Sequence, residues 1–147
     1  MYTVLSEREH VLARPDMYIG SIEVADLNNI PVFSASTGIL SFETKRASPA
    51  IVQLFDEILQ NAIDESSRFP NDCKNIKITF DPTNKIVSIE NDGRGIPVEP
   101  FSETNKSYIP TVLFSEFRSG SNFVDNGTRI TGGKNGVGAK ATNIFST

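Results

Sequence analysis

An α+β fold is predicted by two features of this sequence, a long amphipathic helix and, directly after it, a pair of alternating strands. Apolar residues recur at helical spacing between positions 51 and 63. Ile76, Ile78 and Phe80 then alternate with polar residues, which is typical of a half-buried strand. With 147 residues, 38% of them apolar, the chain can build one hydrophobic core and one domain.

The composition excludes several classes of protein. The chain carries 14 Lys and Arg residues against 18 Asp and Glu residues, so its net charge of −4 provides no broad basic field for DNA phosphates. The single cysteine, Cys73, excludes an internal disulfide, and no apolar run approaches the roughly 18–20 residues of a membrane span. Charged residues are spread through positions 1–20, which excludes a secretory signal. We expect a soluble intracellular protein that by itself binds DNA poorly and does not bind membranes.

The first 48 residues predict little regular structure. A short helix is expected from Ser6, because Glu9 lies three residues later as in a capping box, and Pro15 ends that helix. Residues 23–48 are polar and interrupted, with one strand pair at positions 32–33 and 39–42. Residues 1–22 are therefore interpreted as an arm.

The clearest element is a helix that begins after Ser48. Ser48 suits the N-cap, Pro49 is tolerated at the first helical position, and the helix is expected to end between positions 66 and 68. Its apolar stripe consists of Ile51, Leu54, Phe55, Ile58, Ala62 and Ile63.

A β-hairpin is predicted after this helix. Strands at positions 76–80 and 86–89 are joined by a turn at residues 81–84 (DPTN), and the second strand leads into residues 91–95 (NDGRG). A shorter helix is expected at positions 110–117 and another near Ala139. The stretch between them, at about positions 118–138, is rich in Gly, Ser and Asn and is interpreted as a lid.

Four polar residues of the long helix lie on one strip, spaced at i, i+4, i+7 and i+11. They are Glu57, Asn61, Asp64 and Arg68. Such a strip is usually a solvated face, but Asn61 is a poor residue for the middle of a helix, which favours a specific role for its amide. Mg²⁺ takes oxygen ligands, often only one or two from the protein beside phosphate oxygens. The Asn61 carbonyl can therefore hold Mg²⁺ while Glu57 orients a water molecule.

The second motif is residues 91–97 (NDGRGIP), at the end of the predicted hairpin. Two glycines separated by one residue allow a tight backbone turn, and at a strand end a polar side chain can meet the base of a ligand. The alternative is an ordinary turn that ends the strand.

The third motif is residues 132–140 (GGKNGVGAK), which contains four of the ten glycines within seven residues. Such a loop, followed by a helix, can direct backbone N–H groups at an anion, so it favours phosphate binding. It is not a Walker A loop, because Ala139 stands where that motif has lysine. It formally matches a dinucleotide fingerprint at Gly136, Gly138 and Ala141, but no apolar strand precedes it.

The three motifs, taken in this order, resemble the Bergerat (GHKL) ATP-binding fold shared by gyrase, Hsp90, MutL and histidine kinases. Residues 14–20 (RPDMYIG) resemble the arm of gyrase and eukaryotic topoisomerase II, and residues 139–146 (AKATNIFS) resemble the helix after their glycine loop. The resemblance to type II topoisomerases implies a two-layer α/β sandwich, with a mixed, mostly antiparallel sheet and helices on one face. Residues 1–22 would be the arm and residues 23–147 an incomplete ATP-binding domain.

The resemblance also implies roles for individual residues. Glu57 would be the general base for a water molecule that attacks the γ-phosphate, Asn61 would ligate Mg²⁺, and Asn91 would hold adenine. Ser121 and Asn122 would contact the ribose or α-phosphate, and Arg68 would reach a phosphate from the end of its helix. The nucleotide-binding residues implied are Asn61, Arg68, Asn91, Gly95, Ile96, Ser121, Asn122, Lys134, Asn135, Gly136, Val137, Gly138, Ala139 and Lys140.

Some positions indicate a subgroup of the family. Asn91 in place of the usual aspartate, residues 121–123 (SNF) and residues 108–110 (YIP) resemble eukaryotic topoisomerase II, whereas residues 136–138 (GVG) are more bacterial. This mixture favours a viral or phage enzyme. The expected location is the cytoplasm, which would be that of the host for a virus or phage, or the nucleus for a eukaryotic enzyme.

The family's remaining parts are expected outside this chain. A transducer domain would supply a lysine to the γ-phosphate, and a separate region would carry the tyrosine that cleaves DNA. ATP and Mg²⁺ are the cofactors implied, DNA is a partner of the full-length enzyme, and the arm would join two copies when ATP is bound. The alternatives are a non-catalytic nucleotide-binding or interaction module and a sensor-kinase ATP domain. A sensor kinase would lack the arm, and its phosphoacceptor domain is missing because His10 is the only histidine.

Overall fold

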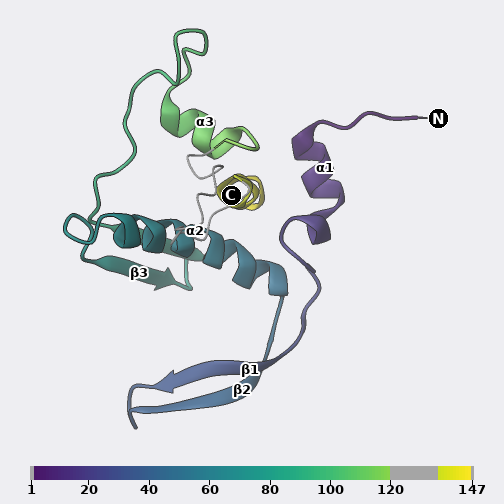
Figure 1. The fold of residues 1–147 in the computed structure, drawn as a ribbon. Coiled ribbons are helices and arrows are strands. Elements are labelled where there is room, and N and C mark those ends of the chain that lie inside the picture. The colour runs from purple at the N-terminus through teal and green to yellow at the C-terminus, as the bar shows by residue number, and fades with distance from the viewer. Residues whose placement is uncertain (1, 120–135, 147) are drawn as a thin grey trace, which may run out of the picture.

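The computed structural model describes residues 2–119 and 136–146, and its elements belong to the expected α+β class (Figure 1). In chain order they are α1 (Glu7–Ala13), the 3-10 helix η1 (Pro15–Met17), β1 (Ala25–Ser34), β2 (Ile39–Ala47), α2 (Pro49–Arg68), β3 (Ile76–Asp81), β4 (Ile86–Asn91), α3 (Ile109–Ser115) and α4 (Gly138–Phe145). Within the described ranges, the strands form two separate antiparallel pairs, β1–β2 and β3–β4. The parallel pairing of a mixed sheet is therefore not found in this part of the chain.

Helix α1 begins where the capping box predicts. The Glu9 backbone N–H donates to Ser6 Oγ over 3.3 Å, and the Ser6 N–H donates to Glu9 Oε2 over 2.8 Å. These bonds pair N–H groups that the first turn of a helix leaves without intrahelical partners. Pro15 then starts η1, and Gly20 follows with a φ of +78°, a conformation that favours glycine.

The hairpin β1–β2 is longer than the two short strands predicted from the sequence. Its register pairs Phe33 with Leu40 and Pro31 with Phe42, which places these apolar residues on one face. The register shifts between Leu27 and Ile30, where the chain carries an extra residue as in a β-bulge. The opposite face also carries apolar residues, Ile30, Val32 and Ile39, so these strands lack a simple alternation of apolar and polar residues.

Helix α2 has the predicted bounds, but its N-terminus is held in another way. Ser48 makes no side-chain cap; its Oγ instead donates to the Ser21 carbonyl over 3.2 Å, and the Ala50 N–H donates to the same carbonyl over 3.0 Å. Ser48 is thus the N-cap residue, as predicted, but its hydroxyl binds a carbonyl distant in the sequence instead of an N–H group of the first turn. No helix in the described part of the chain is long and apolar enough to cross a membrane.

The hairpin β3–β4 lies along α2 (Figure 1), and the Phe55 and Phe80 rings meet with centroids 5.8 Å apart. Its turn is stabilised by Asp81, whose Oδ1 accepts a hydrogen bond from the Asn84 N–H over 3.0 Å. The apolar stripe of α2 is only partly covered: Ile51 is 69% exposed and Ile63 39% exposed. The stripe is thus wider than the surface that the described strands cover.

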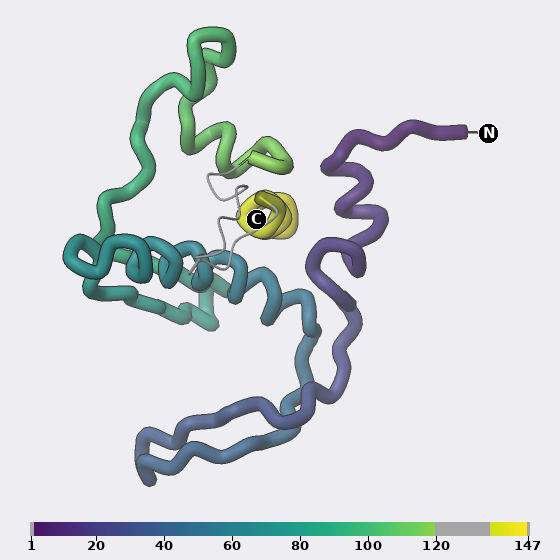
Figure 2. The backbone as a smooth tube through the Cα atoms, in the orientation of Figure 1, coloured from purple at the N-terminus to yellow at the C-terminus, as the bar shows by residue number. Residues whose placement is uncertain are grey.

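Helix α4 lies among α1, α2 and α3 (Figures 1 and 2). Ala141 of this helix is fully buried and packs with Ile19 and Ala50 in a small core. The hairpin β1–β2 projects away from this helical part, as does the N-terminal end of the chain (Figure 2). Helix α4 therefore packs against α1, α3 and the part of α2 that carries Glu57.

Candidate functional site

Glu57 and Gly138 meet where α2 passes the first turn of α4. A Cβ atom added at Gly138 would overlap the Glu57 carboxylate, so the backbone of α4 approaches this side chain as closely as glycine permits. The Gln53 amide, one turn earlier on α2, donates to Glu57 Oε1 over 2.7 Å and orients the carboxylate. Backbone N–H groups in the first turn of a helix have no intrahelical partner and attract anions. A carboxylate and a helix N-terminus that can attract an anion therefore lie side by side.

Asn61 lies one turn after Glu57 and is exposed. Its Nδ2 donates to the Glu57 backbone carbonyl over 2.9 Å, so its Oδ1 points away from that carbonyl and can receive a ligand. No group of three or more His, Cys, Asp and Glu side chains with metal-binding geometry occurs in residues 2–119 and 136–146. A single amide oxygen beside a phosphate site fits Mg²⁺, which keeps several waters and takes few protein ligands.

Asp64, on the same strip of α2, is buried, with 2% of its surface exposed. The Gln60 amide donates to Asp64 Oδ1 over 2.7 Å. The strip is therefore not a uniformly solvated face. Arg68, in the last turn, is exposed, and its Nε donates to the Asp64 carbonyl over 3.3 Å.

Asp92 clamps the second motif to the segment that precedes β3. Its Oδ1 accepts hydrogen bonds from the Lys74 N–H over 2.8 Å and the Asn75 N–H over 2.9 Å, and its Oδ2 accepts one from the Asn75 amide over 2.7 Å. These bonds, first among them those from Asn75, lower the pKa of Asp92 from 3.8 to about 2. The carboxylate form of Asp92 therefore stabilises the fold at neutral pH.

This shift predicts a specific loss of stability in acid. Because the folded state lowers the pKa of Asp92, its contribution is fully present above about pH 4 and is lost as the pH falls toward about 2. Asp92→Ala is expected to lower the melting temperature at pH 7 and to flatten its decline between about pH 4 and pH 2. Thermal melts across this range test the claim, with Asp26→Ala on β1 as the control. A decline in Asp92→Ala as steep as in the wild type would contradict it.

Asn91 ends β4 and is half-buried against Cys73. Its Nδ2 lies 3.7 Å from Cys73 Sγ, in a hydrogen bond to sulfur. A Cβ atom at Gly93 would lie 2.8 Å from Asn91 Nδ2 and 2.7 Å from Glu65 Cγ, so the loop needs glycine to pass. Gly95 adopts a φ of +73°, and Ile96 is 40% exposed beside it.

Sequence reasoning assigned no role to Glu65, Phe69 or Arg94, which the structure brings together. Arg94 Nε lies 3.3 Å from Glu65 Oε1, and the guanidinium carbon lies 3.1 Å from the centroid of the Phe69 ring. A guanidinium over an aromatic face gains cation–π attraction. Arg94 lies in the second motif and Glu65 in the long helix. No local sequence pattern indicated that these two residues, 29 positions apart, form a pair.

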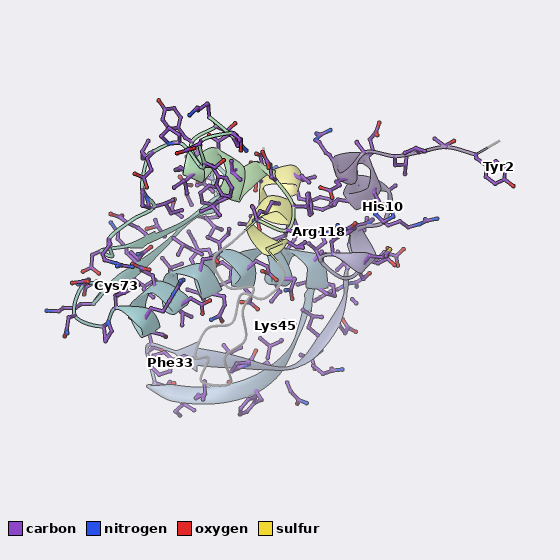
Figure 3. The ribbon with its side chains drawn as sticks, turned by 45° about the horizontal axis from the view of Figure 1, so that its top comes forward. Tyr2, His10, Phe33, Lys45, Cys73 and Arg118 are labelled. Atoms are coloured by element: carbon purple, nitrogen blue, oxygen red, sulfur yellow. The ribbon has the colours of Figure 1, made fainter. Side chains whose placement is uncertain are left out.

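The described part of the glycine motif begins at Gly136, which has a φ of +59°. The Arg118 N–H donates to the Gly136 carbonyl over 3.2 Å, and Figure 3 shows Arg118 beside α4. Lys140 is buried, with its Nζ donating to the Ser119 carbonyl over 2.7 Å, and desolvation lowers its pKa. The predicted lid lies largely outside the described residues, as do Ser121, Asn122, Lys134 and Asn135.

Comparison with known proteins agrees with the fold described above. The sequence profile described as histidine kinase-, DNA gyrase B-, and HSP90-like ATPase matches residues 47–147. The chain belongs to this GHKL ATPase family. Candida albicans DNA topoisomerase 2 is 43% identical over 146 residues, which are 99% of this chain and 10% of the relative. Human DNA topoisomerase 2-alpha is 40% identical over 148 residues, which are 100% of this chain and 9% of the relative.

Solved GHKL structures have the same fold. The ATPase region of Saccharomyces cerevisiae topoisomerase II superposes with a TM-score of 0.91 at 38% identity, covering 99% of this chain and 38% of the other. The ATPase and transducer domains of Balamuthia mandrillaris topoisomerase II give 0.91 at 38% identity, covering 99% and 36%. The predicted resemblance to type II topoisomerases is confirmed. The chain spans about 10% of the length of the curated relatives it matches.

Within this GHKL domain, the predicted site residues fall into two groups along α2. Glu57, Asn61 and Gly138 are adjacent at one level of the helix, and Asn91 lies with Cys73 and Glu65 at another. Eight residues separate Glu57 from Glu65, which corresponds to about 12 Å along a helix axis. The assignments of Arg68, Gly95 and Ile96 to the nucleotide stay predictions.

Proposed function

We propose that this chain is the ATP-binding and ATP-hydrolysing region of a type II DNA topoisomerase. The observation that carries the proposal is the contact of the Glu57 carboxylate with Gly138, at the start of the helix that follows the glycine motif. Membership of the ATPase family gives the substrate class, and the names of the relatives give the parent enzyme. The ATPase activity is a property of the family; the DNA topoisomerase reaction belongs to the full-length protein.

In this proposal Glu57 is the general base. Its carboxylate orients a water molecule, which attacks the γ-phosphorus while the bond from that phosphorus to the β–γ bridging oxygen breaks, and the proton of the water passes to the carboxylate. The products are ADP and inorganic phosphate. The N-terminus of α4 and the backbone of residues 136–140 bind the triphosphate, because helix N–H groups stabilise negative charge.

Asn61 would hold Mg²⁺ through Oδ1, and the ion would neutralise charge on the phosphate oxygens. Asn91 contacts adenine at the other level of α2. The two levels are about 12 Å apart along the helix axis. The base would be met at the end of β4, and the reacting phosphate between α2 and the start of α4.

In the full-length protein, ATP would join two copies through the arm and so gate the passage of DNA. Tyr2 and Val4 are exposed, which supports their availability to a second copy. The alternatives of a sensor-kinase domain and a non-catalytic module have no comparable support, because the relatives and structures named above are topoisomerases.

Nucleotide titration by calorimetry tests the binding part of the proposal. The wild-type chain is expected to bind ATP, and more tightly with Mg²⁺ than without it. Asn91→Ala is expected to weaken binding by about 1–3 kcal/mol, because it leaves a buried hydrogen-bonding group of the base without a partner.

Asn28→Ala, on β1, is the matched control and is expected to bind like the wild type. Equal ATP affinity in Asn91→Ala and the wild type would overturn the adenine contact. A wild-type chain that binds no ATP would overturn the proposed function as a whole.

A further inference from the structure

The orientation of the Asn91 carboxamide is decided by a residue outside the three sequence motifs. Its Nδ2 donates to Cys73 Sγ over 3.7 Å, within the ordinary range of hydrogen bonds to sulfur. Among residues 2–119 and 136–146, no group donates a hydrogen bond to Asn91 Oδ1. The amide therefore presents its oxygen, and not its NH₂ group, as the side that remains available to a ligand.

We propose that Cys73 is a positioning residue that holds this orientation, and that the site therefore selects 6-amino purine nucleotides over 6-oxo purine nucleotides. The inference rests on the proposed function, since it concerns the base that Asn91 contacts. The amino group of adenine donates to the Asn91 oxygen. The 6-oxo group of hypoxanthine accepts hydrogen bonds and would face that same oxygen without a donor between them.

An asparagine needs such a positioning residue, whereas an aspartate does not. Both oxygens of a carboxylate accept hydrogen bonds, so either orientation recognises an amino group. A carboxamide turned by 180° presents a donor and would recognise the 6-oxo base. A free Asn91 amide would thus accommodate both purines, and only a fixed one discriminates between them.

The surroundings of Cys73 are built to keep its sulfur in place. The Cys73 side chain is 1% exposed, so water has little access to its sulfur. Its backbone N–H donates to the Phe69 carbonyl over 2.9 Å, and its carbonyl accepts from Ser66 Oγ over 3.1 Å. Figure 3 shows Cys73 near the C-terminal end of α2, where the chain turns toward β3.

The same residues fix the distance between sulfur and amide. Asp92 binds the N–H groups of Lys74 and Asn75, so the chain next to Cys73 is fastened to the chain next to Asn91. Gly93 packs closely against both residues, since a Cβ atom there would lie 3.3 Å from Cys73 Cβ and 2.8 Å from Asn91 Nδ2. These contacts hold the sulfur beside the Asn91 amide.

Competition titrations with ATP and ITP (inosine triphosphate) test the proposal through the ratio of the two dissociation constants. The wild-type chain is expected to bind ATP about 5- to 150-fold more tightly than ITP, the effect of one unmatched buried hydrogen-bonding group. Cys73→Ala removes the acceptor and is expected to bring the ratio close to one. Cys73→Val, which fills the space without an acceptor, should behave as Cys73→Ala does.

The ratio separates positioning from a merely structural role, because a loosened fold weakens both nucleotides alike and leaves the ratio unchanged. In an Asn91→Asp background, Cys73→Ala is expected to leave the ATP preference intact, since a carboxylate accepts in either orientation. A Cys73→Ala or Cys73→Val protein with the wild-type ratio would overturn the proposal. A wild-type chain that binds ITP as tightly as ATP, or more tightly, would also overturn the proposal, although nucleotide binding itself would stand. A wild-type chain that binds neither nucleotide would contradict the proposed function, on which this inference rests.

Discussion

Glu57→Ala is expected to remove most of the ATPase activity of the full-length protein, by about 10²- to 10⁴-fold, while ATP affinity stays nearly unchanged. The carboxylate touches the start of α4 and, in the proposed reaction, takes the proton of the attacking water. It contributes to the chemical step more than to the binding of ground-state ATP. The measurements are steady-state phosphate release and calorimetric titration with ATP.

Asp56→Ala is the matched control, because Asp56 is the neighbouring carboxylate on α2 and is exposed. It is expected to hydrolyse ATP like the wild type. The Glu57→Ala protein should still dimerise with ATP in sedimentation experiments, and should stay dimeric for longer because ATP persists. Near-normal turnover by Glu57→Ala would show that Glu57 is not the general base.

Gly138→Ala is expected to lower turnover by about 10²-fold without lowering the melting temperature. The added Cβ atom would overlap the Glu57 carboxylate, which is the far end of a flexible side chain and can rotate away. Gly138 has no positive φ, so alanine fits its backbone, and alanine is the better helix former. The fold is thus preserved while the proposed base, Glu57, is displaced from its position beside the first turn of α4.

A double variant distinguishes this mechanism from damage to the phosphate-binding loop. In Gly138→Ala/Glu57→Ala the methyl group has no carboxylate to displace, so turnover is expected to be no lower than in Glu57→Ala alone. ATP affinity in Gly138→Ala should remain close to that of the wild type. A large loss of affinity would mean that the methyl group acts on the loop and not on Glu57.

The elements that sequence alone predicted are those fixed by short-range chemistry. The capping box of Ser6 and Glu9 spans three residues, and the turn at Asp81 and Asn84 spans three as well. Such bonds form within one turn of chain, so the sequence pattern contains both partners. The bounds of α2, β3 and β4 were predicted to within about two residues from local patterns, whereas β1 and β2 are longer than predicted.

The contacts that sequence reasoning missed join residues far apart in the chain. The hydroxyl of Ser48, the N-cap residue of α2, binds the Ser21 carbonyl over 27 positions, and the Asn91 amide meets Cys73 over 18. A local pattern cannot reveal which distant group arrives at a helix end or behind an amide. The motifs thus located the candidate site, whereas the residues that orient Asn91 became visible only in three dimensions.

The two hydrogen bonds at the base of the undescribed segment have a consequence for evolution. Arg118 N–H to the Gly136 carbonyl and Lys140 Nζ to the Ser119 carbonyl join the chain on either side of residues 120–135. Ser119 is itself bound to α3, since its Oγ donates to the Val112 carbonyl over 3.0 Å. Neither bond uses an atom of residues 120–135. Substitutions among those residues can therefore accumulate without removing either bond.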